Sequence, residues 1–285
     1  MILALLAALA LAAAHPGHEG EDAPVERVIS GEGYTLDGTF QQGGMVFGTA
    51  EPGAQVFLGE DTLMVSADGR FVFGFGRDAG EIADLTIVRQ SGEIVRKPLS
   101  IAKAEWRVER IDGLPSSKVD QFTEEQLAKI GEDRKKKNAA RALVFETTDW
   151  AEGFDWPATG RISGVFGSKR ILNGDDNGRF HSGLDIAAPA GTPILAPASG
   201  TITLAEPDMY FEGGLVFMSH GQRVESAFMH MSRLDVAPGE RVEKGDVIGA
   251  IGSTGRSTGP HLHWSVRWNG TLVDPRRLLG EMPSE

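Results

Sequence analysis

The chain of 285 residues contains no cysteine. This absence excludes disulfide bonds and attachment to a lipid through a lipobox cysteine, so an oxidising compartment would impose nothing on the fold. It also means that a metal ion would have to be bound by histidine, aspartate or glutamate side chains.

An excess of positive charge is missing as well. The sequence has 28 lysines and arginines against 40 aspartates and glutamates, which gives a formal net charge of -12 and a pI near 5.1. A protein that wraps duplex nucleic acid needs clustered basic side chains to displace counterions. We therefore expect no nucleic-acid partner.

The apolar run at residues 2–14, ILALLAALALAAA, is too short to span a bilayer and ends in the small residues that signal peptidase accepts. We predict that residues 1–14 are a signal peptide that is cleaved near His15. The protein would then be periplasmic or secreted, with no stable membrane insertion once the signal is cleaved. Because a positively charged segment before the run is lacking, an uncleaved anchor is the alternative.

Two segments follow the predicted signal. Residues 15–26, HPGHEGEDAPVE, are acidic and lack aromatics, so we expect a flexible N-terminus in which His15 and His18 have no preorganised metal cage. Residues 27–103 contain short apolar runs broken by turn signals such as Asp68-Gly69 and Ser91-Gly92, which is typical of hairpins. Phrases such as GTAEPGAQVFLG resemble bacterial Ig-like spacer domains, and we predict an Ig-like β-sandwich here.

The rest of the chain divides into a connector and a second β domain. Residues 104–153 are expected to form a helical connector, because Thr123 and Gln126 make a capping box ahead of a charged helical segment. Residues 154–285 are rich in glycine and proline and contain short β-like runs. We predict a mainly β protein whose second domain is a sandwich or partly open barrel with long functional loops.

Histidines concentrate in this second domain. Five of the seven lie there, namely His181, His220, His230, His261 and His263. Since side chains at i and i+2 of a strand face the same way, His261 and His263 would present two imidazoles to one side. His220 falls where a hairpin turn is expected, and we interpret it as structural.

A metal site can be built from these residues. His181 and Asp185 would converge if Gly183 lets the backbone curl between them, and a nitrogen and a carboxylate oxygen are normal zinc donors. Three protein ligands leave a fourth position open, which distinguishes catalytic zinc from structural zinc. An open position allows zinc to activate water and to polarise a carbonyl oxygen, as hydrolysis of an amide requires.

The motifs HSGLD, AFMH and GPHLHW, in this order between about Gly160 and Asp274, closely resemble the LytM-type zinc peptidases (the M23 family, lysostaphin-like). The resemblance implies a LytM-like peptidase domain and a zinc-dependent endopeptidase that hydrolyses amide bonds in peptidoglycan stem peptides or cross-links. Cell-division or wall-remodelling proteins would be possible partners.

Carried over to this sequence, the resemblance makes His181, Asp185 and His263 the zinc ligands. His230, in AFMH, and His261, the first histidine of the HLH motif, would be the catalytic pair. The resemblance does not assign which of the two is the main base.

Two other functions remain. Some LytM domains have lost ligands and act as non-catalytic regulators that activate cell-wall amidases, although all three ligand positions are present here. A structural cell-wall binder would need a fourth protein ligand to close the zinc site, which His261 could supply only by giving up its catalytic role.

Overall fold

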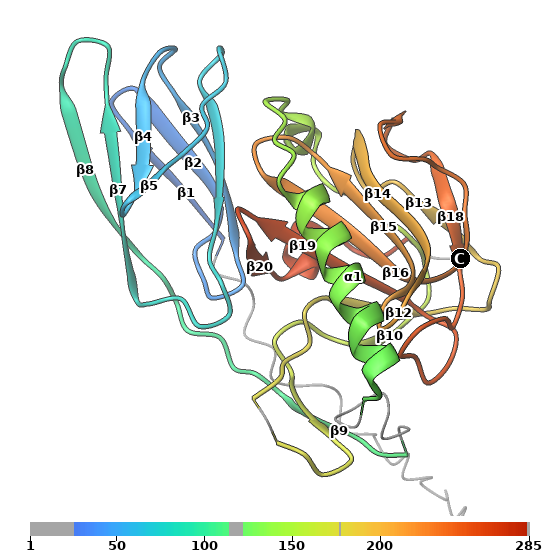
Figure 1. The fold of residues 1–285 in the computed structure, drawn as a ribbon. Coiled ribbons are helices and arrows are strands. Elements are labelled where there is room, and N and C mark those ends of the chain that lie inside the picture. The colour runs from blue at the N-terminus through green and yellow to red at the C-terminus, as the bar shows by residue number, and fades with distance from the viewer. Residues whose placement is uncertain (1–25, 114–121, 177, 284–285) are drawn as a thin grey trace, which may run out of the picture.

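The structure, a computed structural model, describes residues 26–113, 122–176 and 178–283. The predicted signal peptide, residues 1–14, lies outside this range, as do His15 and His18. The chain forms an N-terminal and a C-terminal β domain, and one α-helix lies against the C-terminal sheet (Figure 1). None of the described helices is long and apolar enough to cross a membrane. The predicted mainly β fold is confirmed.

The N-terminal domain is a sandwich of two four-stranded antiparallel sheets, as predicted. Alternation places one face of each strand in the core, as in β2, where Tyr34 and Leu36 are buried and Thr35 and Asp37 are exposed. The first sheet has the order β1-β2-β3-β6 and the second the order β5-β4-β7-β8. The strands are β1 (Glu26–Gly31), β2 (Tyr34–Thr39), β3 (Met45–Ala50), β4 (Gln55–Leu58), β5 (Asp61–Thr62), β6 (Arg70–Gly74), β7 (Ile82–Val88) and β8 (Ile94–Ser100).

The two predicted turns differ in what they connect. Ser91-Gly92 joins β7 to β8 in a hairpin, and Gly92 has a φ of 85° that glycine adopts without strain. Asp68-Gly69 also forms a tight turn, but β6, which follows it, pairs with β3 in the other sheet. The hairpin predicted there is wrong, because the segment before the turn crosses between the sheets instead of pairing with β6.

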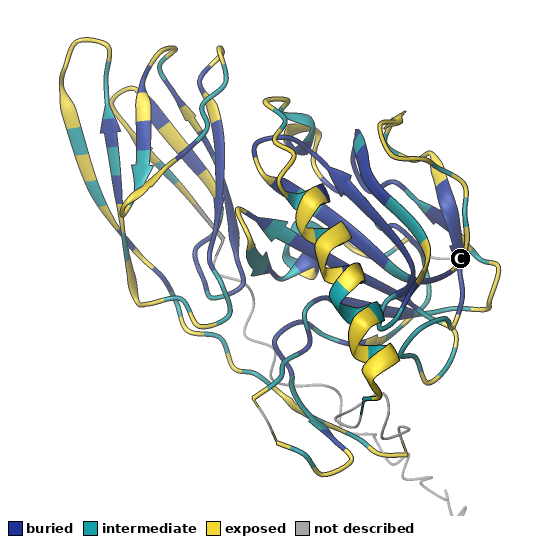
Figure 2. Cartoon of the chain, viewed as in Figure 1, coloured by how far each residue is buried: buried dark blue, intermediate teal, exposed yellow. Residues whose placement is uncertain are grey.

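The connecting region holds the helix α1 (Glu124–Arg141), which begins with the predicted capping box between Thr123 and Gln126. Its outer face is exposed (Figure 2), whereas basic side chains tie it to the C-terminal sheet. Lys136 pairs with Glu206 at 2.9 Å and Arg141 with Glu225 at 3.1 Å. Basic side chains of α1 therefore help to attach the helix to the sheet.

The connecting region is less helical than the sequence suggested. Besides α1 and the short 3-10 helix η2 (Asp149–Glu152), it contains the strand β9 (Val108–Ile111), which pairs in parallel with β11 (Lys169–Leu172). Four residues carry too short a pattern to predict a strand, and the pairing joins segments about sixty residues apart.

The C-terminal domain is built on a ten-stranded sheet. Its main path has the order β10-β12-β19-β16-β15-β14-β17, and β13, β18 and β20 attach to it. The strands are β10 (Arg161–Gly164), β12 (Leu184–Ala187), β13 (Pro193–Leu195), β14 (Gly200–Met209), β15 (Gly213–Ser219), β16 (Val224–Leu234), β17 (Arg241–Val242), β18 (Val247–Ile251), β19 (Leu262–Trp268) and β20 (Thr271–Val273), and the 3-10 helix η3 (Pro275–Leu278) follows. The buried strand β19 lies between β12 and β16, so residues on it are held from both sides.

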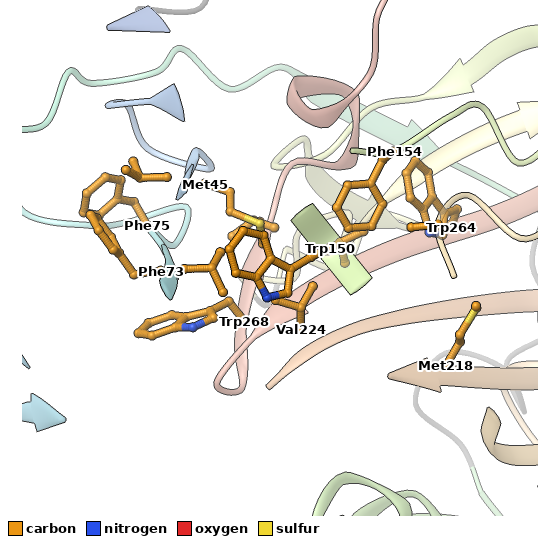
Figure 3. Packing of buried hydrophobic residues seen from close by; sticks show 14 of the residues in the cluster. Met45, Phe73, Phe75, Trp150, Phe154, Met218, Val224, Trp264 and Trp268 are labelled. Carbon is orange, nitrogen blue, oxygen red and sulfur yellow. The ribbon is translucent and has the colours of Figure 1, made fainter. Parts of the chain in front are cut away.

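One apolar core joins the two domains. Met45 and Phe73 of the sandwich pack in the same cluster as Trp150, Trp268 and Val224 of the remainder (Figure 3). The rings of Phe47 and Trp150 stack with centroids 5.4 Å apart. A core shared in this way fixes the orientation of the two domains.

Candidate metal centre

The centre forms where β12 lies beside β19. Asp185 and His263 are directly opposite each other in this antiparallel pair, and Oδ1 of Asp185 lies 2.7 Å from Nδ1 of His263. His181, just before β12, places Nε2 2.9 Å from the same oxygen and 3.0 Å from Nδ1 of His263. All three side chains are buried. The structure thus brings together the three residues proposed as ligands.

Two glycines make room for this arrangement. A Cβ atom on Gly183 would lie 2.2 Å from the carbonyl oxygen of Trp264 and 2.9 Å from Nε2 of His263. A Cβ atom on Gly164 would lie 2.5 Å from Oδ2 of Asp185. Gly183 has no positive φ, so it serves close packing against β19 rather than the backbone curl that the sequence suggested.

A hydrogen bond from the ring nitrogen that faces away from Asp185 orients His181. Nδ1 of His181 donates to the carbonyl oxygen of Val165 at 2.9 Å, which leaves the lone pair on Nε2, the atom that faces Asp185. Burial lowers the pKa of His263 to about 4, so this ring is neutral near pH 7. Neutral imidazoles with a fixed lone pair are the form in which histidine binds metals.

Asp185 is held as a carboxylate. Burial alone would raise its pKa, but the adjacent rings of His181 and His263 outweigh burial and hold the pKa well below its usual range. The other oxygen, Oδ2, accepts a hydrogen bond from Nη2 of Arg170 at 2.9 Å. Glu109 of β9 in turn accepts from Nε of Arg170 at 3.3 Å. A chain of charged groups therefore connects β9 to the centre.

The donor set fits a small divalent cation. The three atoms lie 2.7 to 3.0 Å apart, and donors in a tetrahedral site with bonds of 2.0–2.1 Å are about 3.3 Å apart, so a slight outward shift would accommodate an ion. Two imidazole nitrogens and one carboxylate oxygen are donors that zinc accepts, and three protein ligands leave a fourth position open. Among the described residues no other group of histidines and carboxylates could hold a metal in this way.

His230 and His261 lie beside this centre. Their ring centroids are 4.7 Å apart, and Nε2 of His261 lies 3.8 Å from Oδ1 of Asp185. Nδ1 of His230 donates to the carbonyl oxygen of Thr254 and Nδ1 of His261 to that of Gly259, each at 2.8 Å. On both rings Nε2 is therefore the basic nitrogen. Burial, with His263 and His261 nearby, lowers the pKa of His230 to about 3 and keeps that ring neutral.

His230 has an unusual backbone conformation. Its φ is 64°, within β16, where the pairing with β18 and β15 shifts register nearby. Non-glycine residues in this region are uncommon and cluster at functional sites, and the conformation costs on the order of 1–3 kcal/mol. The backbone N–H of His230 donates to the carbonyl oxygen of Glu212 at 2.8 Å, and this bond helps to hold the conformation.

The remaining histidine of the domain belongs to the core. His220 follows β15 and is fully buried, with Nδ1 2.8 Å from the carbonyl oxygen of Ser199 and Nε2 2.8 Å from Oγ of Ser226. Both nitrogens thus have partners away from Asp185, consistent with the structural interpretation.

An open cleft of about 1010 Å³ leads to the centre. The glycine-rich loop at residues 252–260 forms part of its wall. Sequence reasoning missed Arg170, Arg179 and Arg256, which also line it. Arg170 lies on β11 and Arg179 precedes β12, so their positions depend on pairing that the sequence pattern does not reveal.

Comparisons with known proteins agree with this geometry. Residues 179–275 match Peptidase family M23. The chain is 45% identical over 117 residues to the DD-carboxypeptidase/endopeptidase Mpg of Neisseria meningitidis, covering 40% of this chain and 26% of that protein. It is 37% identical over 123 residues to the peptidoglycan DD-endopeptidase ShyC of Vibrio cholerae, covering 43% of this chain and 28% of that protein. The chain thus matches about a quarter of the length of these curated relatives.

The similarity to a solved structure extends over both domains. A crystal structure of a putative peptidase M23 from Pseudomonas aeruginosa superposes with a TM-score of 0.64 at 29% identity, covering 84% of this chain and 95% of that one. The arrangement of a β domain before the peptidase domain is therefore shared with that protein.

Proposed function

We propose that this chain, whose C-terminal domain belongs to Peptidase family M23, is a zinc-dependent endopeptidase that hydrolyses amide bonds in peptidoglycan stem peptides or cross-links. One observation carries the proposal. The side chains of His181, Asp185 and His263 converge beside an open cleft. The imidazoles of His230 and His261 lie next to them and line the same cleft. The names of the relatives, which include a peptidoglycan DD-endopeptidase, support the choice of substrate.

Zinc fits the proposed ligands best. His181 contributes Nε2, Asp185 contributes Oδ1 and His263 contributes Nδ1, and the absence of cysteine leaves a nitrogen and oxygen donor set. When bound there, zinc would supply Lewis-acid polarisation of the scissile carbonyl and activation of a water molecule.

The protein's own residues would supply proton transfer. His230 and His261 each have Nδ1 tied to a backbone carbonyl, so Nε2 can accept a proton from the attacking water and return it to the leaving amine. After one imidazole has taken the proton, the pair can also donate a hydrogen bond to the oxygen of the scissile carbonyl as negative charge develops on it. The buried surroundings strengthen such interactions because water competes less with them.

We place the enzyme in the periplasm or outside the cell. The predicted signal peptide at residues 1–14 supports export, and the substrate is found only there. Wall-remodelling or cell-division proteins would be its neighbours.

Digestion of purified peptidoglycan by the mature, zinc-loaded protein tests the proposal. We expect mass spectrometry to show cross-linked dimers converted to monomers, and we expect a chelator to abolish the conversion and added zinc to restore it. The His261→Ala variant should bind zinc but release no fragments. If zinc-loaded wild-type protein released nothing yet stimulated a cell-wall amidase, the chain would instead be a non-catalytic regulator.

A further inference from the structure

The cleft is basic although the protein is acidic. The formal net charge of the chain is -12, yet among the described residues the cleft is lined by five arginines and by two carboxylates, those of Glu109 and Asp185. The arginines are Arg110, Arg161, Arg170, Arg179 and Arg256. A divalent cation on the candidate metal centre would add to this positive charge. The local sign of charge is thus the reverse of that of the whole chain.

Three of these arginines form an inner group that separate segments bring together. Arg170 lies on β11, Arg179 precedes β12, and Arg256 lies in the glycine-rich loop before β19. Each is partly buried. All three line the same cleft. Burial, with the charges of Arg179 and Arg170 nearby, lowers the pKa of Arg256, although the carboxylate of Glu212 acts in the opposite direction.

Contacts with neighbouring residues hold two of the inner arginines, Arg170 and Arg256, in position. Arg170 is held between Asp185 and Glu109. The guanidinium of Arg256 lies 4.7 Å from the ring centroid of Phe211, and its backbone N–H donates to the carbonyl oxygen of Phe211 at 2.7 Å. Stacking of this kind helps to orient a guanidinium group.

Positive charge gathered in a cleft favours an anionic ligand. Guanidinium groups match carboxylates in particular, because two parallel N–H bonds meet the two oxygens. A cleft of about 1010 Å³ is open enough for a peptide in extended form, and both the candidate metal centre and the arginines line it. A peptide that carries a free carboxylate near the bond to be cleaved has the complementary shape and charge.

We propose that Arg256 and Arg179 bind a free carboxylate of the peptide substrate, so that the cleft selects anionic peptides over otherwise identical neutral ones. Arg170 adds positive charge to the inner group of arginines, while its guanidinium stays hydrogen-bonded to Asp185. The inference rests on the proposed endopeptidase function and specifies which substrates that function accepts.

Matched substrates test this inference. Cross-linked muropeptides released from purified peptidoglycan are compared with the same muropeptides after their carboxyl groups have been converted to amides. For the zinc-loaded wild-type protein we expect kcat/KM to be about 10-fold higher for the acidic form, mainly through KM, because a charge-assisted bidentate pair is stronger than a neutral hydrogen bond. Raising the salt concentration should reduce this preference.

Variants assign the effect to the arginines. Arg256→Gln and Arg179→Gln should each bring the ratio of acidic to amidated kcat/KM toward one, and Arg256→Lys should retain only part of the preference because lysine cannot form the bidentate pair. Arg134→Gln, which removes the same charge from the exposed face of α1, is the matched control and should leave the ratio unchanged. Equal rates for both substrates, or the same ratio in Arg256→Gln as in wild type, would overturn the inference.

A binding assay separates this inference from the proposed function. Fluorescence anisotropy of labelled acidic and amidated muropeptides is measured with the zinc-loaded His261→Ala protein, in which turnover is expected to be absent. Binding that prefers the acidic form and is lost with an added Arg256→Gln change supports the inference, even if the wild-type protein cleaves neither form. Binding without preference overturns it, even if the wild-type protein cleaves both.

Discussion

Arg170 and Asp185 form a charge-assisted hydrogen bond of 2.9 Å between Nη2 and Oδ2, on the side of the carboxylate that faces away from the two histidines. The other oxygen, Oδ1, is thereby left to meet Nε2 of His181 and Nδ1 of His263. Outer groups that orient metal ligands in this way affect metal affinity although they never touch the ion. The relationship also makes the parallel pair of β9 and β11 part of the support of the centre.

Replacement of Arg170 by glutamine should weaken zinc binding about 10- to 100-fold, since Asp185 would lose the partner that fixes its orientation. Competition with a chromogenic chelator measures the Kd. Lys169→Gln is the matched control, because Lys169 lies on the same strand but forms an exposed ion pair with Asp176. Tighter zinc binding in Arg170→Gln would mean that the charge of Arg170 repels the ion more than its hydrogen bond helps.

The two histidines of the HLH motif should respond differently to substitution. We expect His263→Ala to lose both zinc and hydrolysis, because Nδ1 of His263 is one of the three converging atoms. His261→Ala should keep zinc at the wild-type stoichiometry while hydrolysis falls about 10²- to 10⁴-fold, as is typical for loss of a general acid or base. Zinc content by atomic spectroscopy and dimer cleavage by mass spectrometry distinguish these outcomes. A zinc-free His261→Ala protein would make His261 a ligand instead.

Much of the fold and of the centre follows from local sequence signals. Strand alternation indicates the sandwich, and Thr123 with Gln126 marks the start of α1. The i, i+2 spacing of His261 and His263 anticipates that both line one cleft, since a strand repeats every second residue. These features depend on neighbours in the sequence, and the sequence therefore reveals them.

Features that depend on distant pairing were not predictable. The strand β9 exists because β11 pairs with it, and Arg170 reaches Asp185 only once that pair has formed. The positive φ of His230 likewise arises from register shifts between β16 and its neighbours, which leave no mark in the motif AFMH. Gly183 was singled out correctly as a required glycine, but the reason is the approach of Trp264 rather than a turn.

A methyl group at residue 164 should disturb the centre without any change to its ligands. The Cβ atom of Gly164→Ala would lie 2.5 Å from Oδ2 of Asp185 and 2.9 Å from Cε1 of His181, closer than non-bonded contacts allow. We expect zinc affinity to fall at least about 10-fold, because Asp185 must move away from its two partners. Gly131→Ala, which adds a methyl group on α1 where a Cβ atom would meet no described neighbour within 4 Å, is the control. Unchanged zinc affinity in Gly164→Ala would show that Asp185 can relax without leaving the centre.

Acid should destabilise the fold through His220. Burial lowers the pKa of this histidine in the folded protein to about 4, from an ordinary value of 6.5. Between these pH values the unfolded chain binds a proton on His220 that the folded chain does not bind. The contribution of His220 to the free energy of unfolding is therefore fully present above about pH 6.5 and is lost as the pH falls toward 4. The loss between pH 7 and pH 5 should be about 2 kcal/mol in the free energy of unfolding.

Urea unfolding of wild-type protein and His220→Gln at pH 7 and pH 5 isolates this contribution, because every other titrating group is common to both proteins. At pH 7 the variant should be less stable by about 1–3 kcal/mol, since the ring that bonds Ser199 and Ser226 is lost from a buried site. At pH 5 the gap should narrow by about 2 kcal/mol, because glutamine does not titrate and only the wild-type protein loses stability with acid. A difference of the same size at both pH values would contradict the prediction. It would mean that the folded protein accepts the proton on His220 at pH 5, so that burial does not lower the pKa of this ring.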